Sequence, residues 1–309
     1  MKAIENFLKE KGIFYKKNQP LAAYTTLGIG GKADFIIFPE EKNLLNVMEV
    51  IKNEAVPFYV IGGGSNLLIS DKGFKGAIIN TKKMDNIKLT CLPTGRNGFT
   101  LTVGAGARLG RVLAFLLKRN LSGMEGLAGI PGSVGGAVYG NAGSFGYEIK
   151  DCLEEVEVVN QNMQIIIFKK SELGLHYRSS GLPENSIIKN VKFILPACRQ
   201  AEKEAKKDIF STMKEFLHKK RATQPLKDRS AGCVFKNPDG YSAGFLIDKS
   251  GLKGTRVGDI VVSTVHANYF INVGKGRAED FLKLMDIVKE KVFKSFSIEL
   301  KPEIKFLEV

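Results

Sequence analysis

The sequence is poor in cysteine and histidine, and the few that it has are scattered. Four cysteines and three histidines occur among 309 residues, with no paired spacing among them. Disulfide frameworks and zinc sites need such residues in close pairs, so we expect neither, and no metal site. Uninterrupted apolar runs of about 20 residues, which a membrane helix requires, are also lacking. The amino-terminal residues lack the basic and then apolar pattern of a secretory signal, so we expect a cytoplasmic protein without a membrane span.

Acidic residues are the minority among the charged ones. Lysine and arginine number 46 against 32 aspartates and glutamates, a net charge of +14 that favours anionic partners. The basic residues are spread along the chain, however, and their densest cluster, residues 202–221, is mixed with acidic side chains. A mixed-sign helix face is typical of a solvated surface, so we expect no nucleic-acid partner.

Hydrophobic patterning predicts a mixed α/β protein with more than one compact unit. Apolar residues make up 44% of the chain, which is enough for a core in each of two or three units. A helix at residues 40–54 lies between apolar strands at 33–38 and 57–61. Further strands follow up to residue 195, and a polar, lysine-rich region from Gln200 then opens a new helix. This shift in composition predicts a domain boundary near residue 200.

Two glycine-rich segments are the first candidates for a binding site. Residues 61–68 read Ile-Gly-Gly-Gly-Ser-Asn-Leu-Leu, and residues 129–143 hold six glycines in fifteen positions. Consecutive glycines let backbone amides converge on an anion, although a plain turn between strands is the simpler interpretation of the first segment alone. Neither the Rossmann nor the P-loop signature is present at the first loop. Together the two loops could line an elongated ligand such as a dinucleotide, and the positive charge agrees with this interpretation.

The rest of the chain offers scattered polar candidates. Arg178 follows Tyr177 after a strand-like run and could bind a carboxylate or stabilise developing negative charge. Cys233 stands among small residues before Lys-Asn-Pro, where a buried structural cysteine is the alternative. Glu303 lies at the start of the terminal strand and could be a plain surface carboxylate. His266 lacks an identifiable orienting partner, which argues against hydrolase chemistry.

Taken in order, these motifs resemble the family of UDP-N-acetylenolpyruvoylglucosamine reductases of bacterial peptidoglycan synthesis. The resemblance rests on residues 26–31, 61–68, 129–143, 177–178, 231–238 and 301–303, and it covers almost the whole chain. It implies a fold of mixed α+β and α/β class: an FAD-binding region of two α/β subdomains, like that of vanillyl-alcohol oxidases, and a carboxyl-terminal α+β substrate domain. The implied domains are residues 1–85, 86–200 and 201–309.

The resemblance also implies a reaction and a set of site residues. NADPH would reduce FAD, which would pass hydride to the enolpyruvyl group of UDP-N-acetylglucosamine enolpyruvate to form UDP-N-acetylmuramate. Arg178 and Glu303 would stabilise charge and Cys233 would donate the proton. Glu303 would have to carry or share a proton, because an ionised carboxylate would repel the substrate. The residues implied to hold FAD are Gly62, Gly63, Gly64, Ser65, Asn66, Ile130, Pro131, Gly132, Ser133, Gly140, Asn141 and Ala142. Those implied to contact the substrate are Tyr177, Gln224, Lys236, Asn237 and Asn268.

The chain departs from the family pattern at two points. Cys233 stands where most members have serine, and a thiol, mostly protonated at neutral pH, is a better acid than a hydroxyl. The short connection after Leu195 indicates the branch of the family that lacks a tyrosine-bearing insertion.

Two alternative functions remain: another FAD-linked sugar or hydroxy-acid oxidoreductase of the same superfamily, and a basic nucleotide- or RNA-binding protein without catalysis. We expect a monomer.

Overall fold

The computed structural model describes residues 1–92, 98–196 and 203–308. The chain divides into two compact units, each made of separate segments: residues 1–15, 37–63 and 78–219 form the first, and residues 16–36, 64–77 and 220–309 the second. The sequence analysis expects three consecutive domains, and that division stays a prediction. Its boundary at 200/201 lies outside the described residues.

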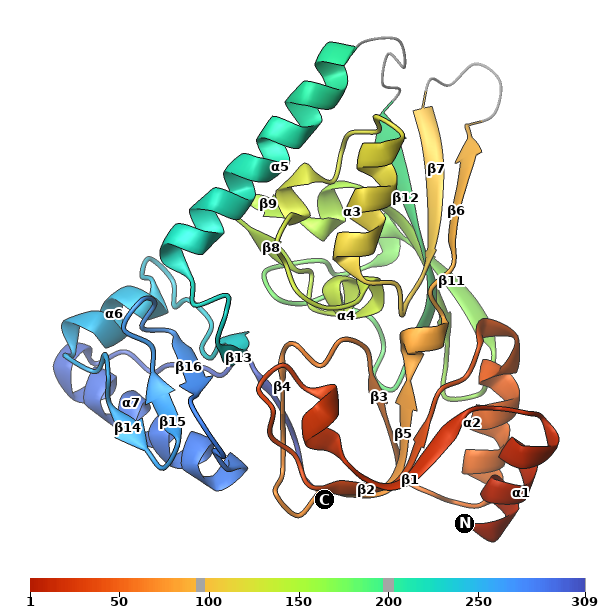
Figure 1. Ribbon diagram of the computed structural model, residues 1–309, viewed down its shortest axis with the longest axis horizontal. Coiled ribbons are helices and arrows are strands. Elements are labelled where there is room, and N and C mark those ends of the chain that lie inside the picture. The colour runs from red at the N-terminus through yellow and green to blue at the C-terminus, as the bar shows by residue number, and fades with distance from the viewer. Residues whose placement is uncertain (93–97, 197–202, 309) are drawn as a thin grey trace. The chain divides into compact units, whose positions relative to one another are not determined.

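The first unit is built on a five-stranded antiparallel sheet in the order β11-β10-β12-β7-β6 (Figure 1). Its strands are β6 (Ile87–Cys91), β7 (Gly98–Gly104), β10 (Leu153–Val159), β11 (Ile165–Lys169) and β12 (Ile187–Pro196). Apolar side chains of helices α3 (Leu109–Lys118) and α4 (Val134–Tyr139) share one buried core with this sheet. The core contains Leu113, Val138 and Phe193, so burial of these side chains holds both helices against the sheet.

A strand, helix and strand occur near the amino terminus, as the hydrophobic pattern predicts. Helix α2 (Leu44–Asn53) buries Leu44, Val47, Met48 and Ile51 at helical spacing. It lies in the chain between β2 (Lys32–Ile37) and β3 (Phe58–Ile61). These strands belong to a four-stranded sheet in the order β1-β2-β5-β3, with β1 (Tyr15–Pro20) and β5 (Phe74–Asn80). Helix α1 (Lys2–Glu10) precedes them.

The second unit is centred on a four-stranded sheet in the order β13-β16-β15-β14. The strands are β13 (Arg229–Cys233), β14 (Arg256–Val257), β15 (Ile260–Val262) and β16 (Tyr269–Asn272). Helices α6 (Ala243–Lys249) and α7 (Ala278–Phe296) pack on it through a core that includes Phe235, Phe270 and Phe281. Strand β17 (Lys305–Leu307) pairs in parallel with β4 (Leu67–Ile69). The carboxyl-terminal strand is thereby paired with the strand that directly follows the glycines at positions 62–64.

Helix α5 (Lys203–Thr223) carries the lysine-rich cluster that the sequence places on a solvated face. Lys220 does not follow that expectation: its side chain is only 2% exposed. Burial lowers the pKa of Lys220 to about 8.

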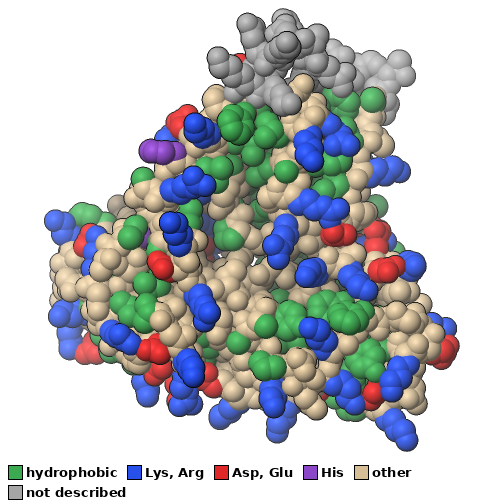
Figure 2. All heavy atoms as spheres, viewed as in Figure 1, with side chains coloured by type: hydrophobic (Ala, Val, Ile, Leu, Met, Phe, Trp, Pro, Cys, Tyr) green, Lys and Arg blue, Asp and Glu red, His purple; other side chains and the backbone are tan. Residues whose placement is uncertain are grey.

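On the face shown in Figure 2, lysine and arginine side chains lie among acidic ones and do not gather into one patch. Among the described residues, no helix is long and apolar enough to cross a membrane, and no cluster of three metal-ligating side chains is found.

Asp71 caps helix α7 from the loop after β4. Its carboxylate accepts hydrogen bonds from the backbone N–H groups of Ala278 at 3.0 Å and Glu279 at 3.2 Å. These are among the first N–H groups of α7, which have no partner within the helix. We expect Asp71→Ala to lower the free energy of unfolding by about 1–2 kcal/mol, measured by urea denaturation. Asp71→Asn keeps one acceptor oxygen and should lose less; equal losses in both variants would contradict the capping role.

Candidate functional site

The two glycine segments meet within the first unit. A Cβ atom built on Gly63 would lie 2.6 Å from the Cα of Gly132, and one built on Gly62 would collide with the hydroxyl of Ser133. Real Cβ atoms do not approach other atoms so closely, so only glycine allows this contact. Gly63 is exposed and Gly132 is half-buried. The contact therefore forms a surface of backbone atoms almost without side chains.

The second glycine segment is partly helical, which differs from the expected loop. Residues 134–139 form the six-residue helix α4, and the side chain of Ser133 caps it by accepting a hydrogen bond from the N–H of Gly136 at 3.3 Å. A Cβ on Gly135 would lie 2.8 Å from the Cβ of Ala105, so glycine here lets helix α4 pack closely on the segment that contains Ala105. Gly132 and Ser133 thus stand at the end of a helix that favours negative charge.

Thr81 adds a polar atom that the sequence analysis missed. Its side chain is 3% exposed, and its hydroxyl has no hydrogen-bond partner within the described part of the chain. A Cβ on Gly62 would lie 3.8 Å from this oxygen. Buried polar atoms are almost always paired, so an unpaired one beside a glycine loop is typical of a ligand contact. A threonine after a strand carries no sequence signal of its own, and only the tertiary contact identifies it.

These features fit a phosphate-bearing cofactor. Backbone without side chains, a helix amino terminus and an unpaired buried hydroxyl all occur at the contact of Gly62 and Gly63 with Gly132 and Ser133. Ile130 and Pro131 lead into this contact along the chain. Gly140, Asn141 and Ala142 lie at the opposite end of α4, about 9 Å along the helix axis at 1.5 Å per residue. The candidate cofactor residues of the second glycine segment therefore lie at both ends of one short helix, whereas Gly64, Ser65 and Asn66 belong to the second unit.

Asn141 is buried, and its side chain is used within the protein. Its amide nitrogen donates to the Glu148 carboxylate and to the backbone oxygen of His176, both at 3.1 Å. Its amide oxygen accepts from the N–H of Lys150 at 3.3 Å. Any contact of Asn141 with a cofactor would therefore be made by its backbone, and its side chain ties the end of α4 to the segment that carries Arg178.

Tyr177 and Arg178 form a two-residue turn. The backbone groups of His176 and Ser179 exchange hydrogen bonds of 3.2 and 3.1 Å, which leaves the two residues between them at its tip. Arg178 has a φ of +58°, a left-handed conformation that is uncommon for residues other than glycine and costs conformational energy. Tyr177 is exposed, and its ring lies 5.2 Å from the guanidinium of Arg178.

Arg178 is held near the hairpin of β8 (Gly143–Ser144) and β9 (Tyr147–Glu148). Its guanidinium donates to the backbone oxygen of Gly143 at 3.4 Å. Burial acts to raise the pKa of Glu148, but hydrogen bonds from Lys150 and Asn141 and the charges of Lys150 and Arg178 outweigh it and lower that pKa. Glu148 is thus ionised at neutral pH, and its negative charge attracts the guanidinium of Arg178.

Cys233 and Glu303 are brought together in the second unit. Cys233 is half-buried at the end of β13, opposite Tyr269 of β16. Val234 is the residue after Cys233, and its backbone oxygen accepts a hydrogen bond from the N–H of Glu303 at 2.8 Å. The side chain of Asn66 donates to the backbone oxygen of Glu303 at 3.2 Å. Three candidates that lie far apart in the sequence, Asn66, Cys233 and Glu303, therefore occupy adjacent chain segments.

The candidate substrate residues occupy different settings. Lys236 is half-buried, and its N–H donates to the backbone oxygen of Lys301 at 2.9 Å. The side chain of Asn237 accepts from the N–H of Ala243 at 3.0 Å and so supports the start of α6. Gln224 is half-buried at the end of α5. Asn268 is buried, and its side chain hydrogen bonds to the backbone of Phe235.

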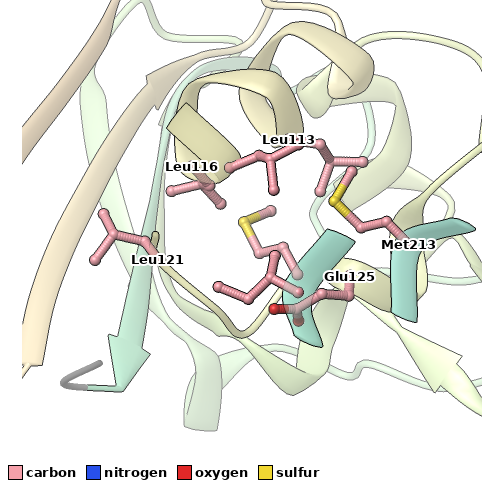
Figure 3. Close-up of a pocket in the computed structure, with 8 residues that line it drawn as sticks. Leu113, Leu116, Leu121, Glu125 and Met213 are labelled. Atoms are coloured by element: carbon pink, nitrogen blue, oxygen red, sulfur yellow. The ribbon is translucent and has the colours of Figure 1, made fainter. Parts of the chain in front are cut away.

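A hollow in the first unit carries little polar chemistry. The space beside α3 and α5 is about 160 Å³ when space open to solvent is included, but it is too narrow to enclose a water molecule, and Figure 3 shows apolar side chains around it. Its one charged lining residue, Glu125, accepts a hydrogen bond from the N–H of Gly123 at 2.9 Å. The lining residues are Leu113, Leu116, Leu117, Leu121, Met124, Glu125, Ile209 and Met213. None of them is a candidate site residue, and we assign this hollow no role in catalysis.

Comparisons with known proteins identify the family of this chain. Residues 33–168 match the family model of an FAD binding domain, and residues 224–307 match that of the UDP-N-acetylenolpyruvoylglucosamine reductase carboxyl-terminal domain. The reductase of Caldicellulosiruptor bescii is 40% identical over 98% of this chain and 94% of its own length. That of Carboxydothermus hydrogenoformans is 41% identical over 94% and 93%.

A solved structure extends the likeness to the fold. The crystal structure of the reductase from Thermus caldophilus covers 96% of this chain and 99% of its own, with a TM-score of 0.77 and 36% identity. The predicted fold class, the FAD-binding region and the recognised family are thereby confirmed. The chain is an FAD-dependent oxidoreductase and belongs to the UDP-N-acetylenolpyruvoylglucosamine reductase family.

Proposed function

We propose that this protein uses NADPH to reduce the enolpyruvyl group of UDP-N-acetylglucosamine enolpyruvate, forming UDP-N-acetylmuramate. The observation that carries the proposal is the full-length likeness to UDP-N-acetylenolpyruvoylglucosamine reductases. It is supported by the glycine contact in the first unit and, in the second, by a half-buried Cys233 whose following residue, Val234, hydrogen bonds through its backbone to Glu303. A nucleotide-sugar substrate and NADPH suit a cytoplasmic reaction, and we propose that the chain acts as a monomer.

FAD held at the glycine segments of residues 62–66 and 130–142 would supply the redox chemistry, by which hydride from NADPH would reach the distal vinyl carbon of the substrate. The protein must then stabilise the negative charge left on the carbon that bears the carboxylate and the ether oxygen. Arg178 supplies a permanent positive charge for this, because a guanidinium stays protonated in proteins. The left-handed backbone of Arg178 agrees with a side chain held in one direction for function.

Cys233 completes the reaction by protonating that carbon. The thiol gives its proton to the carbanion, a C–H bond forms, and the resulting thiolate takes a proton back from solvent. A thiol of ordinary pKa, about 8.5, is mostly protonated at neutral pH and is acidic enough to donate. Glu303, in its protonated form, would donate a hydrogen bond to the substrate carboxylate and so share its charge. Tyr177, Lys236, Asn237 and Gln224 are proposed to orient the substrate.

The visible spectrum of the purified protein is the first test. A flavoenzyme should show the absorbance of oxidised flavin, which NADPH bleaches and the enolpyruvyl substrate restores. The matched control substrate is UDP-N-acetylglucosamine, which lacks the double bond and should not restore it. A colourless protein that binds RNA would favour the non-enzymatic alternative, and a flavin reoxidised only by oxygen would favour an oxidase of the same superfamily.

Thr81 is expected to contribute to FAD binding. Thr81→Val removes the buried hydroxyl and keeps the shape of the side chain, so FAD should dissociate more easily, with a dissociation constant raised about 5- to 100-fold for one lost hydrogen bond. The measurement is titration of the apoprotein with FAD by flavin fluorescence. Thr81→Ser keeps a hydroxyl and should restore most of the affinity. Unchanged affinity in Thr81→Val would show that the hydroxyl does not contact the cofactor.

A further inference from the structure

The side chain of Asn268 binds the backbone of Phe235, two residues after Cys233. Its amide oxygen accepts from the N–H of Phe235 at 2.9 Å, and its amide nitrogen donates to the backbone oxygen of Phe235 at 2.8 Å. The backbone oxygen of Asn268 also accepts from the N–H of Val234 at 2.8 Å. The side chain is 2% exposed. An amide that forms both bonds with one residue in a buried place fixes the position of that residue.

Cys233 needs such support because the strand ladder is interrupted before it. The pairing of β13 with β16 shifts register between Ser230 and Cys233, and Gly232 has a φ of +77°. A bulge of this kind leaves the residues within it without regular ladder hydrogen bonds. Beyond this bulge, the pairing of Cys233 with Tyr269 and the hydrogen bonds made by Val234 and Phe235 set the position of the Cys233 backbone.

His266 supports Asn268 and the strand position opposite Cys233. Its Nδ1 atom accepts a hydrogen bond from the N–H of Asn268 at 3.2 Å. Its ring packs edge-on against Tyr269, with 4.9 Å between the centroids, and Tyr269 pairs with Cys233 across the strands. Burial, together with the charge of Lys253, lowers the pKa of His266. The imidazole is therefore neutral at neutral pH and able to accept this bond.

We propose that Asn268, supported by His266, is a positioning residue that aims the Cys233 thiol for proton transfer. This assignment replaces the substrate contact that the family resemblance implies for Asn268, because both ends of its side-chain amide already bind Phe235. It rests on the proposed function, in which Cys233 is the proton donor. His266 acts through Asn268 and Tyr269 and takes no part in proton transfer.

The test compares three variants of the full-length protein loaded with FAD. Asn268→Ala removes both bonds to Phe235, and His266→Phe keeps a ring against Tyr269 but removes the acceptor for Asn268. The matched control is Asn272→Ala. Asn272 is the last residue of β16, the strand that Asn268 directly precedes. It is 5% exposed, and its side chain binds Leu27, Gly274 and Gly276, not residues 233–235. Stopped-flow absorbance measures each half-reaction, and mass mapping of iodoacetamide-treated protein measures alkylation of Cys233.

Asn268→Ala should slow flavin reoxidation by the enolpyruvyl substrate about 10- to 100-fold, because a small misplacement of a reacting group has effects of this size. Flavin reduction by NADPH and the KM for the substrate should stay near wild type, and alkylation of Cys233 should become faster as the half-buried thiol is released. His266→Phe should slow the same step about 2- to 10-fold, as loss of one hydrogen bond does.

Three results would overturn the proposal. One is a raised KM with an unchanged kcat in Asn268→Ala, which would mean substrate contact. Another is an equal loss in both half-reactions, matched by Asn272→Ala, which would mean general destabilisation. The last is unchanged alkylation of Cys233. If the wild-type flavin is not reoxidised by the enolpyruvyl substrate, the proposed function fails, whereas the alkylation rates still decide whether Asn268 positions the thiol.

Discussion

Replacing Cys233 by alanine is expected to slow the reoxidation of bound flavin by the enolpyruvyl substrate about 10²- to 10⁴-fold, the usual contribution of a general acid. The reason is that alanine has no proton to give to the carbanion that hydride transfer creates. Flavin reduction by NADPH involves no such proton and should stay near its wild-type rate. Both half-reactions can be followed separately by stopped-flow absorbance of the flavin.

Two further cysteine variants complete this experiment. Cys233→Ser restores an exchangeable proton at the same place and should recover much of the lost rate, although a hydroxyl is the weaker acid. Cys91→Ala removes an exposed thiol on β6 and should behave as wild type in both half-reactions. Equal losses in the two half-reactions of Cys233→Ala would contradict the role of proton donor.

Gly63→Ala is expected to weaken FAD binding about 10- to 150-fold, which corresponds to the cost of forcing one extra carbon into a packed contact. The new Cβ would stand 2.6 Å from the Cα of Gly132 and 3.1 Å from the backbone nitrogen of Ser133. Because the obstacle is backbone, no side chain can turn aside, and the two glycine segments must separate. Flavin content after purification and titration of the apoprotein with FAD would measure the loss.

Gly110→Ala is the matched control for this substitution. Gly110 lies in helix α3, where a Cβ would meet no atom within 4 Å. Alanine forms helix better than glycine by up to about 1 kcal/mol, so this variant should bind FAD normally and be slightly more stable. Wild-type FAD affinity in Gly63→Ala would show that the contact between the glycine segments is not part of the cofactor site.

The periodic elements were predictable because short-range patterns determine them. Helix α2 was expected at residues 40–54 from the spacing of Leu44, Val47, Met48 and Ile51, and it is found at residues 44–53. The strand before it and the strand after it were expected for the same reason. The segment 129–143 was harder, since its glycines are typical of a loop. There, a capping serine and packing of Gly135 against Ala105 stabilise the short helix α4.

The candidate site shows a similar limit. Glycine-rich composition indicated the two cofactor segments, but nothing in the sequence showed that Gly63 would touch Gly132. Asn268 was expected at the substrate on the strength of resemblance alone. That contact stays a prediction; the structure shows that its side chain binds Phe235, because folding brings the residue before β16 beside the segment that follows β13. Thr81 had no distinguishing pattern and was missed.

The amino-acid sequence by itself determined the family, the types of side chain available for the reaction, and most helices and strands. Each of these depends on residue identity or on spacing over a few positions. The tertiary structure alone decided that the glycine segments touch, that Glu303 lies beside the residue after Cys233, and that Lys220 is buried on a helix otherwise rich in charge. These facts depend on contacts between segments far apart in the chain, and such contacts follow from packing of the whole core.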